Sequence, residues 1–70
     1  MEMRIDVSSS KGAWFAIVES LNVFASGTTR AKAVAAAKAG ALMRLAHDLE
    51  KGRRRGGDVQ ALRFSVARAA

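Results

Sequence analysis

A chain of 70 residues without a cysteine forms one small hydrophobic core and has no disulfide or thiolate metal site to stabilise it. Twelve Lys and Arg residues against six Asp and Glu give a net charge of +6, which suits an anionic partner such as nucleic acid, anionic lipid or an acidic protein surface. No apolar run approaches the roughly 20 residues that span a bilayer, and the N-terminus MEMRID is not typical of a secretory signal. We therefore expect a single domain over residues 1–70 that is cytoplasmic and binds no membrane.

The first 25 residues have the periodicity of three strands. Residues 2–7 alternate between apolar and polar side chains, as in a strand with one buried face. The run SSSKG, residues 8–12, consists of turn-forming residues and predicts a hairpin loop. Residues 13–18 are continuously apolar and rich in aromatic and β-branched types, which predicts a central strand covered on both faces. Glu19, Ser20 and Asn22 interrupt the apolar run and predict a turn or bulge, and residues 21–25 predict a shorter third strand.

Residues 27–52 have the sequence of one long helix. Thr28 or Thr29 caps its first turn, and Gly52 suits the position after its last turn. Gly40 in mid-helix disfavours the helix by about 1 kcal/mol relative to alanine, which is tolerated most easily where another backbone approaches closely. An amphipathic helix needs a cover for its apolar stripe, and the strands supply one. The stripe is predicted from the spacing of three or four residues between Val34, Ala37, Ala41, Leu45 and Leu49, and Leu42 widens it.

The C-terminal segment returns to the periodicity of a strand. Residues 59–66 alternate, with Leu62, Phe64 and Val66 on the buried face and Ala61 on the other, and predict a fourth strand. The order β-β-β-α-β is that of an α+β two-layer sandwich, with one long helix on a small, antiparallel-rich sheet. Besides the valine, isoleucine and leucine residues, the core is expected to contain the aromatic residues Trp14, Phe15, Phe24 and Phe64.

Few residues are available for catalysis. The chain has no Cys or Tyr, and its single histidine, His47, falls on the side of the helix away from the apolar stripe. Asp48 beside it points in a different direction, so the two do not form a catalytic pair. The six carboxylates are scattered, and no metal-binding, P-loop or dinucleotide-binding motif is present. We expect no catalytic residues, no metal and no cofactor, and hence a protein that is not an enzyme.

Basic residues gather at both ends of the predicted helix. Arg30 and Lys32 lie in its first turn, where the helix dipole disfavours cations. A bound anion would offset this unfavourable interaction. The loop KGRRRGGD, residues 51–58, can present arginine side chains and backbone N–H groups together to phosphates. A solvated loop that keeps the protein soluble is the alternative. The candidate contacts for nucleic acid or an acidic partner are Arg30, Lys32, Lys51, Arg53, Arg54, Arg55 and Arg63.

A recognisable pattern spans residues 12–52. It is carried by Gly12, Trp14, Ala16, Leu21, Gly27, Thr29, Ala33, Val34 and Ala37. The pattern resembles that of the HicB-like antitoxin family, in particular its solitary N-terminal-type domains. The resemblance implies a partial RNase-H-like β-β-β-α-β fold and a domain that pairs with a small basic toxin that cleaves RNA.

Two functional interpretations stay open at this point. The resemblance implies a non-catalytic protein-interaction module, an antitoxin-like or regulatory small subunit with a protein partner. A domain this small often gains stability by association, so a homo-oligomer is expected too. The alternative is a small basic protein that binds nucleic acid through the arginine-rich loop 51–58.

Overall fold

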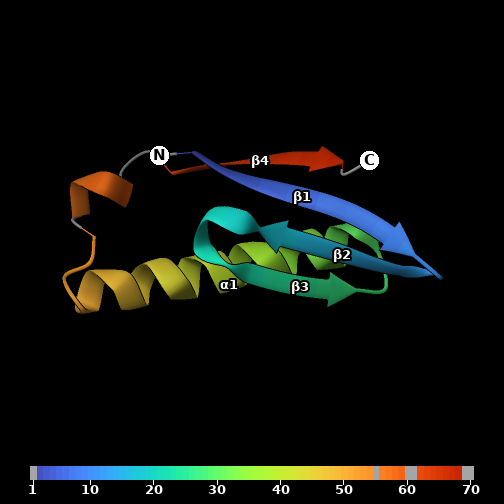
Figure 1. Cartoon of the computed structure of the whole chain (residues 1–70), viewed down its shortest axis with the longest axis horizontal. Coiled ribbons are helices and arrows are strands. Elements are labelled where there is room, and N and C mark those ends of the chain that lie inside the picture. Colours follow the sequence, from blue (N-terminus) through green and yellow to red (C-terminus); the bar gives the residue numbers. More distant parts are fainter. Residues whose placement is uncertain (1, 55, 60–61, 69–70) are drawn as a thin grey trace.

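One long helix packs on one face of a four-stranded sheet in the computed structural model of this chain, which describes residues 2–54, 56–59 and 62–68 (Figure 1). The elements are β1 (Glu2–Ser10), β2 (Ala13–Val18), β3 (Val23–Gly27), α1 (Arg30–Glu50) and β4 (Arg63–Arg68). The strands lie in the order β3-β2-β1-β4, and all neighbours are antiparallel except β4, which runs parallel to β1. The α+β class predicted from the sequence is confirmed, with a mixed sheet.

The first hairpin is tighter than the sequence predicts. β1 continues to Ser10, and in its pairing with β2 Ser9 lies opposite Trp14. Only Lys11 and Gly12 form the turn, and both have positive φ angles, 52° and 80°. A two-residue turn with two positive φ angles matches the twist of the strands it joins. The serines predicted to form a loop therefore lie in the β1–β2 ladder.

The third strand starts two residues later than predicted. Glu19–Leu21 forms a 3-10 turn, and Asn22, at a φ of 54°, leads the chain into β3. Asparagine adopts this left-handed conformation more readily than most residues. Leu21 is buried in the core. The sequence predicts that Leu21 begins the strand, but Leu21 lies in the turn and its side chain packs inward from there.

The core lies between α1 and the inner face of the sheet, the face that α1 covers. Helix α1 packs chiefly over β3 and β2 and to a smaller extent over β1 (Figure 1). Alanine on the helix allows this close approach, while larger strand residues fill the space. The buried residues are Met3, Ile5, Val7, Ala16, Val18, Leu21, Ala33, Ala37, Ala41 and Leu45.

The buried stripe of α1 differs from the predicted stripe at both ends. Ala33 rather than Val34 is fully buried near the start, and Asp48 rather than Leu49 is buried near the end. Leu42, predicted to widen the stripe, is exposed. Small residues allow the helix axis to lie closer to the sheet, so the face of α1 that carries the alanines packs against the sheet and the face that carries Leu42 does not.

Among the described residues, no helix is both long and apolar enough to cross a membrane.

β4 begins four residues later than predicted. Gly56–Val59 forms a second 3-10 turn, and Ala61, predicted to lie in the strand, is outside the described residues. Phe64 lies beside Met3 in the parallel pairing with β1 and packs against the core. Because α1 lies mainly over β3 and β2, Val66 on the same face of β4 is 38% exposed.

The outer face of the sheet, opposite α1, carries exposed aromatic side chains. Phe15, Ile17 and Phe24 lie on it, and the rings of Phe15 and Phe24 are 5.9 Å apart. Phe24 is 66% exposed, whereas Trp14 packs against the core. The prediction that Phe15 and Phe24 belong to the core is therefore wrong. The apolar run of β2 indicated two covered faces, but within the described residues only one face is covered.

Candidate functional site

The predicted basic residues at the two ends of α1 do not form one site. Arg30 and Lys32 lie in its first turn, and Lys51, Arg53 and Arg54 follow its last turn. The helix has 21 residues, and a helix of that length is roughly 30 Å long. One phosphate or one acidic side chain therefore cannot contact both groups.

The remaining predicted residues lie elsewhere. Arg63 begins β4, where it pairs with Glu2 of β1, and its side chain is exposed. Arg55 lies outside the described residues. Of the seven predicted residues, the structure therefore brings three together, at the C-terminal end of α1.

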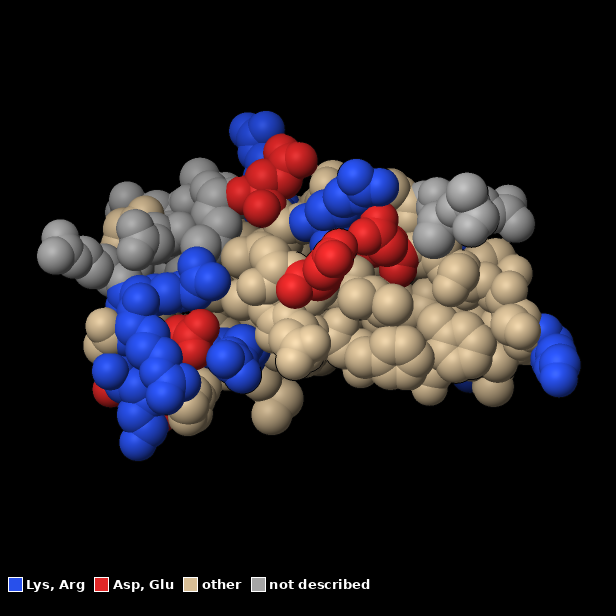
Figure 2. Space-filling view, viewed as in Figure 1, with Lys and Arg blue, Asp and Glu red and all other residues tan. Residues whose placement is uncertain are grey.

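A buried carboxylate organises that end of the helix. Asp48 Oδ2 accepts a hydrogen bond from Nε of Arg54 at 3.3 Å. Its Oδ1 lies 3.4 Å from Nε of Arg44 and 3.9 Å from Nη1 of Arg53. Nδ1 of His47 is also 3.9 Å from Oδ1. These four residues and Asp48 form what we call the Asp48 cluster. Figure 2 shows Lys and Arg side chains gathered around an acidic side chain at the left, the end at which α1 finishes in Figure 1.

The backbone geometry of the helix end explains why the loop residues return to Asp48. Gly52 has a φ of 74°, which L side chains rarely adopt, and its N–H donates to the carbonyl of Leu49 at 3.2 Å. The N–H of Arg53 donates to the carbonyl of Asp48 at 2.8 Å. This pair of bonds is a Schellman motif, which turns the chain back across the last helical turn. The glycine identified in the sequence as a helix stop thus carries the arginines to the carboxylate.

Because Asp48 is buried, its ion pairs are important for the stability of this end of the helix. Its side chain is 8% exposed, whereas those of Arg44 and Arg53 are 50% and 60% exposed. Oδ1 is buried and accepts no hydrogen bond from the described residues. A buried carboxylate without cations nearby is strongly destabilising, so Asp48 depends on the surrounding arginines. Arg44 and Arg53, in contrast, keep half or more of their side-chain surface exposed, and Arg54 keeps 27%.

The sequence does not identify Asp48 and Arg44 as members of this site. Asp48 attracts attention there only as the neighbour of His47, and the apolar spacing predicts Leu49 at the inward position. A signal was present, because Arg44 and Asp48 are four residues apart and such pairs face each other on a helix. The contacts of Arg53 and Arg54 depend on the turn at Gly52, which spacing alone does not reveal.

A second surface feature is a shallow hollow on the outer face. It has a volume of about 400 Å³ and is lined by Glu2, Arg4, Asp6, Glu19 and Ser20. Nε of Arg4 donates a hydrogen bond to Oδ1 of Asp6 at 2.8 Å within this hollow. The hollow therefore combines three carboxylates with one guanidinium and is acidic, unlike the chain as a whole.

Comparison of the chain with protein-family models, curated proteins and solved structures finds no match. These comparisons do not bear on the resemblance to the HicB-like family, which stays a prediction. Among the described residues, no group of three or more His, Asp or Glu side chains is placed to hold a metal ion.

Proposed function

We propose that this chain is a non-catalytic protein-interaction module of HicB type, an antitoxin-like or regulatory small subunit. The observation that carries the proposal is the uncovered aromatic part of the outer face, where Phe24 is 66% exposed beside Phe15. Exposed apolar patches of this kind mark contact surfaces between proteins. Figure 2 shows this surface as a broad tan area beside the charged residues of β1.

The strand order supports the family assignment within this proposal. The resemblance implies a partial RNase-H-like β-β-β-α-β domain, and the sheet has the order β3-β2-β1-β4 with β4 parallel to β1. The charges of the outer face support the kind of partner. A basic toxin would be repelled by the chain's charge of +6 as a whole, but the hollow beside the aromatic residues is lined by Glu2, Asp6 and Glu19.

The test is a growth-rescue experiment with the protein encoded next to this chain. A small basic toxin encoded there should arrest growth when expressed alone, and co-expression of this chain should restore growth. The Phe24→Glu variant should lose the rescue, whereas Met43→Glu, which changes a slightly more exposed apolar side chain on α1, should keep it. Failure of the wild-type chain to form a complex with any neighbouring gene product would count against the proposal.

A second candidate function is the binding of nucleic acid. The observation that favours it is the Asp48 cluster, where three arginines surround one carboxylate and keep an excess of positive charge. Neutralisation of backbone phosphates by such residues makes binding weaken steeply with added salt. An electrophoretic shift of RNA or DNA at low salt that disappears at high salt would support it, and no shift at low salt would oppose it.

A further inference from the structure

We propose that the Asp48 cluster is a binding site for the phosphates of a nucleic-acid backbone, in which Asp48 positions the arginines and does not contact the ligand. The phosphate would be held by Arg44 from the helix and by Arg53 and Arg54 from the loop. This inference rests on the second candidate function. It restricts the binding surface to one end of α1 and adds two residues, Arg44 and Asp48, that the charge pattern of the loop does not indicate.

The arginines of the Asp48 cluster outnumber its carboxylate. Three guanidinium groups approach one carboxylate, so the cluster keeps an excess of two positive charges. Lys51 is exposed beside them. An arrangement that served only to neutralise Asp48 would need one well-placed arginine. The additional arginines leave the cluster attractive to a second anion.

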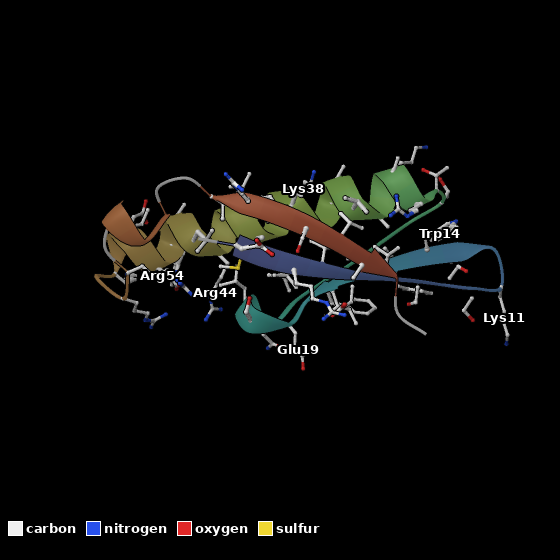
Figure 3. All side chains as sticks on the ribbon, turned by 90° about the horizontal axis from the view of Figure 1, so that it is seen from above. Lys11, Trp14, Glu19, Lys38, Arg44 and Arg54 are labelled. Atoms are coloured by element: carbon white, nitrogen blue, oxygen red, sulfur yellow. The ribbon has the colours of Figure 1, made fainter. Side chains whose placement is uncertain are left out.

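The terminal nitrogen atoms of Arg44 and Arg54 remain available to a phosphate. Arg44 and Arg54 both approach Asp48 through Nε. An arginine has four further N–H donors on its two terminal nitrogens, and none of those of Arg44 and Arg54 donates a hydrogen bond within the described residues. Figure 3 shows the two side chains at the same end of the molecule. Their free donors suit the oxygens of a phosphate, for which arginine is the better matched cation.

Asp48 holds the arginines of the loop in place before any ligand binds. Asp48 fixes the loop twice, because its carbonyl accepts the N–H groups of Arg53 and Arg54 at 2.8 and 3.4 Å while its carboxylate contacts their side chains. The side chain of Asp48 is itself 8% exposed, so the residues packed around it restrict its rotamers. Side chains ordered in advance lose less conformational freedom on binding, which strengthens binding.

The variant Asp48→Asn separates positioning from simple charge attraction, because the two predict opposite signs. If only net charge mattered, removing a carboxylate from a basic surface would tighten the binding of nucleic acid. If Asp48 positions the arginines, the variant binds more weakly despite its extra positive charge. We expect the second result, with a Kd raised about tenfold for each charged contact that is lost. Tighter binding by Asp48→Asn would overturn the inference.

The binding assay is fluorescence anisotropy with a labelled single-stranded RNA and a labelled DNA duplex over a range of salt concentrations. The triple variant Arg44→Gln, Arg53→Gln, Arg54→Gln is expected to reduce the magnitude of the slope of log K against log salt by about 2 for the single-stranded RNA and by about 3 for the DNA duplex. The matched control loses the same charge at the other end of the molecule, through Lys11→Gln, Arg30→Gln and Lys32→Gln (Figure 3 shows Lys11 there). Its slope should change little, and equal losses in both triple variants would overturn the inference.

The outcomes distinguish the site from the function. If the wild-type chain binds neither probe at low salt, both the second candidate function and this inference fail. If it binds but both triple variants lose equally, binding is diffuse and only the site fails. Polyglutamate bound as tightly as RNA would make the site one for acidic proteins and would also overturn the inference. If Asp48→Asn does not fold by circular dichroism, Arg54→Lys decides the question, because it keeps the charge and removes the contact of Nε with Asp48: weaker binding supports positioning, and unchanged binding would overturn the inference.

Discussion

Gly40 of α1 lies so close to Val23 of β3 that a β-carbon on Gly40 would be 2.9 Å from Cγ1 of Val23. The sequence indicated a close approach at this glycine but attributed it to another backbone. The neighbour is a branched side chain, held in a strand over which α1 packs most closely. The glycine therefore provides space for Val23 at the centre of the helix–sheet contact.

Replacing Gly40 by alanine should destabilise the fold even though alanine favours the helix. The helical preference contributes about 1 kcal/mol in favour of alanine. Overpacking against Val23 opposes it by about 1 to 3 kcal/mol. We expect the free energy of unfolding, measured with urea, to fall by about 1 kcal/mol. In a Val23→Ala background the same change should instead be stabilising, and a stabilised Gly40→Ala single variant would contradict the packing argument.

Gly27 should be less tolerant than Gly40, because its neighbour is backbone. A β-carbon there would be 2.7 Å from the backbone N of Ala33, and the start of α1 would have to move to admit it. We expect Gly27→Ala to lower the free energy of unfolding by about 3 kcal/mol. Gly56→Ala is the control, since a β-carbon at Gly56 meets nothing within 4 Å. Similar urea midpoints for the two variants would disprove the close contact.

The sequence predicted those elements of the fold that have a clear hydrophobic pattern. Alternation located β1, a continuous run of aromatic and β-branched residues located β2, and the long helix was recognised from its cap, its body and the glycine at its end. Periodicity does not distinguish alanine from leucine as the buried residue, which is why Leu42 was placed inside and is exposed. It also gives no account of how many faces of a strand are covered, which is why Phe24 was assigned to the core.

The candidate site was predictable only in part, for a physical reason. Loop composition identified Arg53 and Arg54 as cationic, but their partner depends on a positive φ at Gly52 that folds the loop back onto the helix. Asp48 was not predicted as a buried residue, because carboxylates are rarely buried and become so where arginines compensate the charge. Arg30 and Lys32 were grouped with the loop by charge alone, although the length of α1 keeps them apart.

Thr29, rather than Thr28, should contribute the cap of α1. The Oγ1 atom of Thr29 accepts the N–H of Lys32 at 3.1 Å, whereas the sequence left the choice between the two threonines open. We expect Thr29→Ala to lower the free energy of unfolding by about 1 kcal/mol. Thr28→Ala should change it little, because Thr28 is exposed and does not cap the helix. The two variants differ by one position, so equal losses in thermal unfolding would exclude a specific role for the cap.

Phe24 should control self-association if the outer face is a contact surface between copies. The chain carries a charge of +6, so two copies repel each other unless they meet where acidic residues offset the basic ones. The outer face meets that condition, because the hollow lined by Glu2, Asp6 and Glu19 lies beside the aromatic residues.

We expect sedimentation equilibrium to show an oligomer for the wild-type chain and a shift to monomer for Phe24→Glu. Met43→Glu introduces the same charge at a side chain that is 73% exposed on α1, against 66% for Phe24, and should leave the oligomer intact. The comparison separates a specific contact from general charge effects, since both variants lose one exposed apolar side chain. A monomeric wild-type chain, or equal dissociation of both variants, would show that the outer face does not mediate self-association.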